Sequence, residues 1–182
     1  GRKSEELAKK DITLTPVTDK SYYVLDTRDF ADNMTIYVNA DGILNAIQAS
    51  NGLRIMKKPG QSIVFNITEM TTPRAERLVI GQYSVSIDDG ATWIDTTTEA
   101  KDETGTGKPK NIAVDQIILE HITFNATKAE NVYLNTSAGL FLLPSAEIVE
   151  QDNGAGWILA KGTVNSKSEW HFYRHTRNYK TT

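Results

Sequence analysis

Apolar and polar positions alternate with a period of two along most of the chain from Ile12 onward. Segments 12–17, 21–26, 34–39 and 61–67 each carry this alternation and are rich in β-branched and aromatic residues. In the last of them, Ile63, Phe65 and Ile67 share one face. This pattern is typical of a half-buried strand in an antiparallel sheet, and we therefore expect a chain of short strands.

Residues typical of turns separate these segments. They occupy positions 40–42, 50–52, 58–60 and 152–154. We read 77–88 as one strand with Val79, Tyr83 and Val85 on one face. Frequent turns with almost no helix predict an all-β protein, an antiparallel β-sandwich that is jelly-roll-like or Ig-like.

The two ends of the strand region differ from it in composition. Residues 1–10 are charged and helix-forming, with Ser4 as a possible N-cap, and predict a short N-terminal helical arm. We expect 11–182 to form a single β-sandwich domain with a long polar loop at 95–110. The alternative is two small β-domains, 11–94 and 111–176.

Composition excludes several chemistries. The chain has 182 residues, a net charge of −3 and no cysteine, so it forms no disulfide, thiolate nucleophile or cysteine zinc site. Mixed charges argue against nucleic-acid binding, and no apolar run approaches the length of a membrane span. His171 and His175 have metal-ligand spacing only on a helix, whereas their neighbours favour a strand. We expect no metal and no cofactor.

One short motif stands out, the stretch SIDDGATW at 86–93. Its pattern resembles the Asp box, a hairpin motif of sialidase propellers. The resemblance implies a structural turn made by Ser86, Asp88, Gly90, Thr92 and Trp93. Asp88 would accept backbone N–H bonds, Gly90 would take a positive φ, and Trp93 would cover the turn. In sialidases the motif lies away from the catalytic face, and the chain has neither the repeated boxes nor the arginine set of that chemistry.

Ligand-binding candidates are aromatic. Exposed rings stack on sugars, and the candidates are Tyr22, Tyr37, Trp157 and Trp170. A glycoside hydrolase would instead need two carboxyl groups at a set separation, for which the loop acids Glu147, Glu150 and Asp152 are available. The sequence offers no nucleophile motif, and we predict that the protein is not an enzyme.

A wider resemblance covers 34–67, where strands, turns and a Pro-Gly turn alternate. This texture resembles β-sandwich domains of phage virion proteins and bacterial surface proteins. It implies a non-enzymatic structural or adhesion module, such as a capsid decoration, tail or fibre protein of a virion or a cell-surface component. We expect homo-oligomers or assembly on a particle, in a virion or extracellular location, without nucleic acid or membrane. The alternative is a carbohydrate-binding β-sandwich module.

Overall fold

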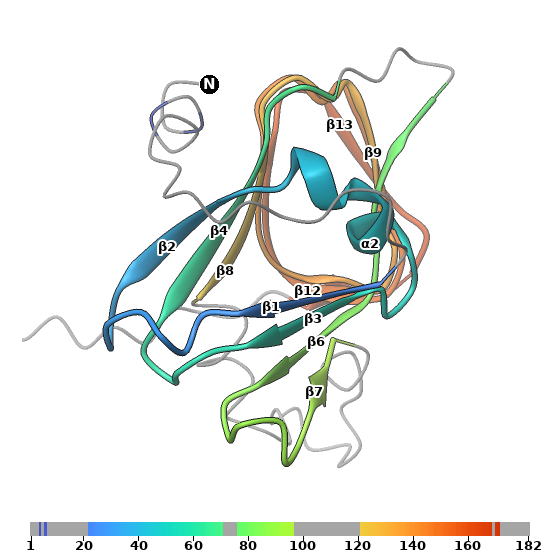
Figure 1. The fold of residues 1–182 in the computed structure, drawn as a ribbon. Helices are drawn as coiled ribbons and strands as arrows, with labels where there is room; N and C mark the ends of the chain where they lie inside the picture. Colours follow the sequence, from blue (N-terminus) through green and yellow to red (C-terminus); the bar gives the residue numbers. More distant parts are fainter. Residues whose placement is uncertain are drawn as a thin grey trace, which may run out of the picture.

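The computed structural model describes residues 4, 6, 22–70, 76–96, 121–168 and 170–171, which form three sheets (Figure 1). The hairpin sheet has the order β1-β3-β6-β7. Its strands are β1 (Tyr23–Asp26), β3 (Leu53–Met56), β6 (Tyr83–Ser86) and β7 (Ile94–Asp95).

The long sheet has six strands and the third sheet has four. The long sheet runs β14 (Trp170–His171), β12 (Gly154–Ala160), β10 (Ala138–Leu143), β8 (Ile122–Ala126), β4 (Ser62–Ile67) and β2 (Thr35–Asn39). The third sheet runs β13 (Thr163–Ser166), β11 (Ile148–Gln151), β9 (Asn131–Leu134) and β5 (Leu78–Ile80). Helix α2 (Leu44–Gln48) lies beside β5 and directly follows the short 3-10 helix η1 (Asp41–Ile43).

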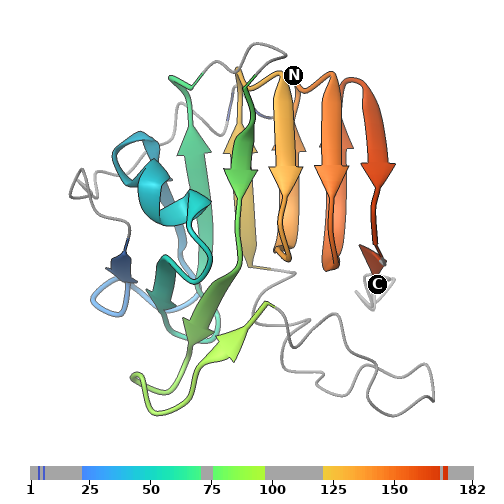
Figure 2. The same ribbon diagram turned by 90° about the vertical axis from the view of Figure 1, so that its right-hand side faces the viewer.

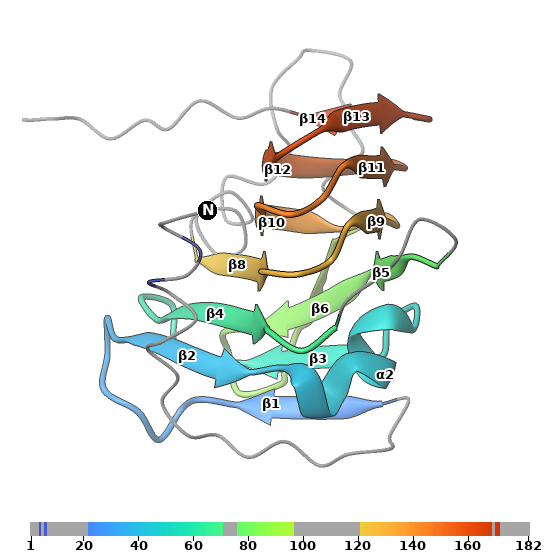
Figure 3. The same cartoon turned by 90° about the horizontal axis from the view of Figure 1, so that it is seen from above.

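Strand pairing is parallel everywhere in the described residues except between β6 and β7. The chain passes from the hairpin sheet to the long sheet to the third sheet and back, as β3, β4, β5 and β6 do in turn. Figures 2 and 3 show successive turns stacked in sequence order along one axis. The fold is therefore a parallel β-helix.

The predicted antiparallel β-sandwich, jelly-roll-like or Ig-like, is wrong. Alternation indicates which face of a strand is buried, but it does not indicate the direction of the neighbouring strand. Turn residues here form corners that carry the chain into the next sheet. At Gly81 the segment read as one strand divides into β5 and β6, and it is Leu78 and Ile80, not Val79, that are fully buried.

The described residues on both sides of the predicted polar loop belong to one core. β4 pairs with β8 across the gap at 97–120, which lies outside the described residues. Whether 11–182 forms one domain, or 11–94 and 111–176 form two, therefore stays a prediction. The β-sandwich architecture expected for either arrangement is wrong. The predicted N-terminal arm is described only at Ser4 and Glu6, both helical.

Two sizes of coil follow one another. Register partners in the hairpin sheet, such as Leu53 and Tyr83, are 30 positions apart, whereas Leu140 follows its partner Thr123 after 17. We call the coils through β1 to β6 the wide coils and those from β8 onward the narrow coils. The narrow coils use only the long and third sheets.

A ladder of phenylalanines joins the two kinds of coil inside the helix. The rings of Phe65 and Phe124 stack at 5.0 Å, and those of Phe124 and Phe141 at 5.8 Å. Tyr83 packs its ring edge-on against Phe124 at 5.5 Å. All four side chains are buried. Parallel pairing in this register places like residues side by side on adjacent strands. The stacked rings therefore stabilise this register relative to a shifted one.

A second ladder lies on the outer face of the long sheet. Asn39, Asn66 and Asn125 are register partners, and Asn125 Nδ2 donates to Asn66 Oδ1 at 2.8 Å. Asn125 also donates to the Ser4 carbonyl at 2.8 Å and accepts from the Ser4 hydroxyl. Ser4 thus helps to cover an outward-facing asparagine that is fully buried.

Glycines make the sharp bend of the narrow coils. Gly139 and Gly156 are register partners with φ of +134° and +118°. A Cβ on Gly156 would lie 1.9 Å from the carbonyl oxygen of Gly139. Only glycine fits where both the close backbone approach and the positive φ are required.

Two buried polar side chains hold the corner between β3 and β4. The Lys57 ammonium donates to the carbonyls of Lys58, Pro59 and Gln61 at 2.9–3.1 Å. The Gln61 side chain donates to Thr27 O at 2.9 Å and accepts from Thr27 Oγ1 at 3.0 Å. Burial lowers the pKa of Lys57 to about 8, because desolvation disfavours its charged form.

Candidate functional site

The Asp-box stretch forms the connection between β6 and β7. Asp88 Oδ1 accepts from the Ser86 hydroxyl and from the Thr92 N–H, both at 2.8 Å, and Asp88 Oδ2 accepts from the Thr92 hydroxyl. The Gly90 N–H donates to Ser86 Oγ at 2.9 Å, and Gly90 has φ of +85°. These hydrogen bonds, led by those from Thr92, hold the pKa of the Asp88 carboxyl below its ordinary value.

The hairpin is tied to β1 by an arginine. Arg28 donates to Asp26 Oδ2 at 2.7 Å and to Asp89 Oδ1 at 3.0 Å. Its hydrogen bonds hold the pKa of Asp26 below the ordinary value. The pairs are exposed, and such pairs contribute little to stability. Their effect is to fix the position of the turn relative to the outer face of the hairpin sheet.

A cluster of aromatic, aliphatic and guanidinium groups occupies that outer face. The Arg54 guanidinium carbon lies 5.0 Å from the ring centroid of Tyr22 and 5.7 Å from that of Trp93. Val24 is the register partner of Arg54 on the neighbouring strand. Tyr22, Val24 and Trp93 are 44%, 38% and 37% exposed. We call these four residues the Arg54 platform.

The printed contacts of the Arg54 guanidinium are with the faces of two aromatic rings. Among the described residues no hydrogen-bond acceptor or carboxylate is in contact with it. Cation–π contacts occupy the faces of the group and leave N–H donors at its edge. The platform therefore combines apolar surface with unused donors.

Polar groups continue along the same row of the sheet. Arg54, Ser84 and Asp95 are successive register partners, so their side chains point to one face. Gln82 Nε2 donates to both carboxylate oxygens of Asp95, at 2.8 and 2.7 Å. An acceptor group is thereby held on the same face as the donors of Arg54.

The sequence-predicted aromatic candidates do not come together. Tyr22 belongs to the platform, whereas Tyr37 and Trp157 lie on one outer row of the long sheet with Val64, Thr123 and Leu140 between them. Trp170 covers the end of the core. Its ring packs edge-on against Phe141 at 6.0 Å, and its Nε1 donates to Gly156 O at 3.1 Å.

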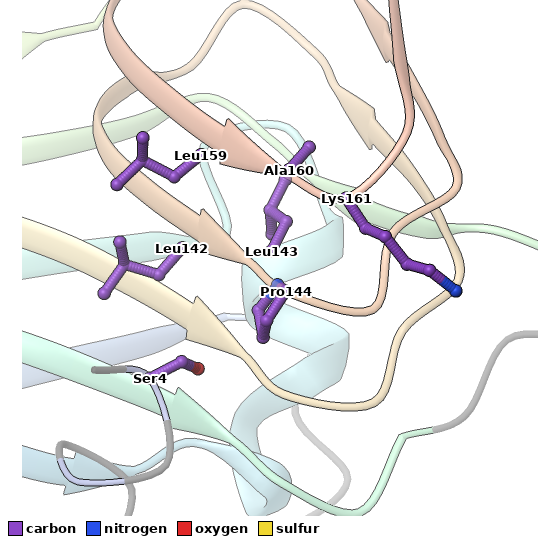
Figure 4. Close-up of a pocket in the computed structure, with 7 residues that line it drawn as sticks. All are labelled: Ser4, Leu142, Leu143, Pro144, Leu159, Ala160 and Lys161. Carbon is purple, nitrogen blue, oxygen red and sulfur yellow. The ribbon is translucent and has the colours of Figure 1, made fainter. Parts of the chain in front are cut away.

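An apolar hollow lies on the outer face of the long sheet (Figure 4). Its volume is about 340 Å³. Leu159, one of the residues in its wall, is 60% exposed. The hollow is lined by Ser4, Leu142, Leu143, Pro144, Leu159, Ala160 and Lys161.

The loop acids considered for hydrolysis are engaged in polar contacts. Glu147 pairs with Lys161 at 3.0 Å, and Glu150 pairs with Arg77 and Lys167 at 3.2 and 3.0 Å. Asp152 accepts from the Tyr133 hydroxyl, which raises the pKa of Tyr133. Each of the three acids thus takes part in charged or polar contacts, and those of Glu150 and Asp152 meet around Tyr133 on the third sheet.

No group of three or more His, Asp or Glu side chains in the part of the chain that the structure describes is placed to hold a metal ion. No helix in the same residues is long and apolar enough to cross a membrane.

Comparison with known proteins found no matching family model, no matching curated protein and no matching solved structure.

Sequence reasoning overlooked Arg54, the centre of the platform. A signal was present, because Arg54 stands between Leu53 and Ile55 in an alternating segment and must therefore face outward. Its proximity to Tyr22 and Trp93 depends on the parallel pairing of β1, β3 and β6, which the alternation does not reveal.

Proposed function

We propose that this chain is a non-enzymatic structural or adhesion module of a virion or cell surface, which displays a binding surface on a rigid β-helix. The observation that carries the proposal is the Arg54 platform. Five large hydrophobic side chains of the described residues are exposed, and Tyr22, Val24 and Trp93 among them surround one arginine. Exposed apolar groups gathered in this way are typical of interaction sites.

The residue types support the same reading. Tyrosine, tryptophan and arginine are the side chains that contribute most to binding when their surface is removed from water. Val24 and Arg54 lie on β1 and β3, and Tyr22 and Trp93 directly precede β1 and β7. Because these strands pack against the core, the cost of ordering the platform on binding is reduced. Arg28 adds a link between β1 and the hairpin.

The test compares the wild type with the double variant Tyr22→Ala/Arg54→Gln and with Tyr37→Ala, a matched change on another sheet. Light scattering measures self-association, and an immobilised glycan panel measures ligand retention. We expect the wild type either to self-associate or to be retained on the glycan panel. The double variant should lose that behaviour, and Tyr37→Ala should keep it. A monomer retained by nothing, with all three proteins alike, would contradict it.

A second candidate function is carbohydrate binding. The specific observation in its favour is that both rings of the platform are exposed beside unused N–H donors, the combination that stacks on and hydrogen-bonds to a sugar. Retention by glycans without self-association would favour this function over an assembly role.

A further inference from the structure

We infer that the last coil of the β-helix binds a second copy of this chain, and that the two copies pair through β13 across a two-fold axis. The inference goes beyond the proposed function, because β13 lies at the opposite end of the stack from β1 and no group of the Arg54 platform is needed (Figure 3). It rests on an edge strand, an open core and a register that is complementary to itself.

Strand β13 has a neighbour on one side only. It ends the strand order of the third sheet, next to β11, and all four of its residues are exposed. The Thr163 N–H donates to the carbonyl of Glu147, directly before β11, at 3.0 Å and therefore points toward β11. Backbone groups alternate in direction along a strand, so the N–H and C=O groups of Val164 and Ser166 point to the open side. No strand of the described residues pairs with them there.

The core is open beside this edge. Successive register partners on the inner face of the third sheet are Leu78, Val132, Val149 and Val164. The first three are fully buried, whereas Val164 is 42% exposed, since β13 is the last strand of that sheet in the described residues. A core position at the end of a stack of coils needs a cover to remove it from water.

Strand β13 lacks the residues that usually protect an exposed edge. Lysine, proline or a bulge commonly prevents an edge strand from pairing with another chain. The sequence Thr-Val-Asn-Ser of β13 has no charge and no proline, and its register with β11 is continuous. The lysines on either side, Lys161 and Lys167, pair with Glu147 and Glu150 at 3.0 Å. The edge is therefore suited to accept a further strand.

Pairing of β13 with itself satisfies its open groups in one register. In an antiparallel pair centred on Asn165, Val164 of each copy lies opposite Ser166 of the other, and these two residues exchange both backbone hydrogen bonds. The two Asn165 side chains then face each other, and each amide has a donor and an acceptor for the other. Thr163 of one copy lies opposite Lys167 of the other, so no like charges are directly opposed.

The two ends of the stack differ, which favours a two-fold dimer over a filament. The first end carries β1 of the hairpin sheet and β2 of the long sheet, whereas the last coil has only the long and third sheets. A head-to-tail contact would join outlines of different size, but two copies of the same end match by symmetry. Such a contact closes after two copies.

The experiment measures the mass of the full chain in solution by light scattering over a range of concentrations. We expect the wild type to be a dimer and Asn165→Lys to be a monomer, because two like charges would meet on the axis. Two controls should remain dimers: Asn45→Lys, the same substitution at an exposed position of α2, and Tyr22→Ala/Arg54→Gln in the platform. Circular dichroism of each variant checks that the fold is retained.

Single cysteines test the register itself, since the chain has none. Asn165→Cys places two thiols opposite each other on the axis, at a Cα separation of about 4.5 Å that permits a disulfide. In Thr163→Cys the same register separates the two thiols by about 13 Å along the strands, because each Thr163 lies opposite Lys167. We expect mild oxidation to cross-link Asn165→Cys and not Thr163→Cys.

A wild type that stays monomeric, or a dimer that Asn165→Lys retains, would overturn the inference. Species larger than a dimer, or equal cross-linking of the two cysteine variants, would overturn it as well. A dimer lost in Tyr22→Ala/Arg54→Gln and kept in Asn165→Lys would reject the β13 edge and support the platform. A dimer lost only in Asn165→Lys supports the edge, and ligand retention in that background then tests the platform by itself.

Discussion

The wide and narrow coils build one continuous core from different amounts of chain. Register partners are 30 positions apart at Leu53 and Tyr83 but 17 apart at Leu140 and Trp157. The wide coils pass through three sheets, and the narrow coils omit the hairpin sheet. The platform and the Asp-box hairpin both lie on the sheet that only the wide coils possess.

The difference in coil size separates coils that mainly enclose the core from coils that also carry exposed side chains and the hairpin. In the narrow coils the chain turns from the third sheet straight into the long sheet at Gly139 and Gly156, and backbone contacts leave no room for a side chain at Gly156. In the wide coils the extra residues form outer surface, corner networks and a hairpin. Repeats of 15 to 17 positions thus suffice for a narrow coil, and the additional chain of the wide coils carries the platform and the hairpin.

The largest expected effect falls on the bend of the narrow coils. Gly156→Ala places a Cβ 1.9 Å from the Gly139 carbonyl oxygen at a φ of +118°. Backbone must move at a site packed on both sides, and we expect a loss of about 4 kcal/mol or more in the free energy of unfolding. Urea unfolding followed by circular dichroism measures it. A loss below about 1 kcal/mol would contradict the tight bend.

Removal of the Phe124 ring, which joins the wide and narrow coils, should lower the free energy of unfolding by nearly as much. Phe124 stacks on Phe65 and Phe141 and is 1% exposed, so Phe124→Ala should destabilise the protein by about 3–5 kcal/mol. Leu159→Ala, at a 60% exposed position of a narrow coil, should change stability by less than about 0.5 kcal/mol. Equal effects of the two changes would argue against the ladder.

A corner of the wide coils should make stability depend on pH. The pKa of Lys57 is lowered from 10.5 to about 8, so between these values the unfolded chain binds more protons and stability rises with pH. From pH 7.5 to 9.5 the contribution of Lys57 should rise by about 2 kcal/mol. Unfolding of the wild type and Lys57→Met at both pH values isolates this change. A difference between the two proteins that does not vary with pH would refute it.

The smallest effect is expected at the hairpin. Gly90 has φ of +85°, but a Cβ there would meet only Met56 Sδ at 3.5 Å and the Trp93 ring at 3.9 Å. Gly90→Ala therefore meets conformational strain without a clash and should cost about 1 kcal/mol. Thermal unfolding compares it with Gly156→Ala, the same substitution in the bend. A larger loss of stability for Gly90→Ala than for Gly156→Ala would contradict the conclusion that the fold depends more on the bend than on the hairpin.

The strands were predictable, and their pairing was not. Ile63, Phe65 and Ile67 are buried on one face as their alternation predicts, because burial depends on the strand's own pattern. The relative direction of two neighbouring strands depends instead on the sheet into which each corner carries the chain. The stretches ending in Gly139 and Gly156 repeat after 17 positions and hold the strongest sign of a coil, since a recurring Ala-Gly step marks the same bend.

The candidate site was only partly visible in the sequence. Tyr22 was selected as a ligand-binding aromatic, and Trp93 was assigned to the turn. The structure places both beside Arg54, a contact across three separate segments that no local pattern encodes. Tyr37, Trp157 and Trp170 are ligand-binding candidates by residue type alone. Residue type does not distinguish a side chain on the outer face of a sheet from one that covers the end of the core.

The central claim, a parallel register of 17 positions between β8, β10 and β12, is tested most directly by disulfide formation. The chain has no cysteine, and Leu142 and Leu159 are register partners on the outer face of the long sheet. The account predicts that Leu142→Cys/Leu159→Cys forms a disulfide under mild oxidation, because adjacent strands bring the two Cα atoms within reach. It predicts none for Glu150→Cys/Trp157→Cys, whose residues face outward from different sheets. The reverse result, a disulfide between 150 and 157 only, is what an antiparallel hairpin at 152–154 would give, and it would contradict the β-helix.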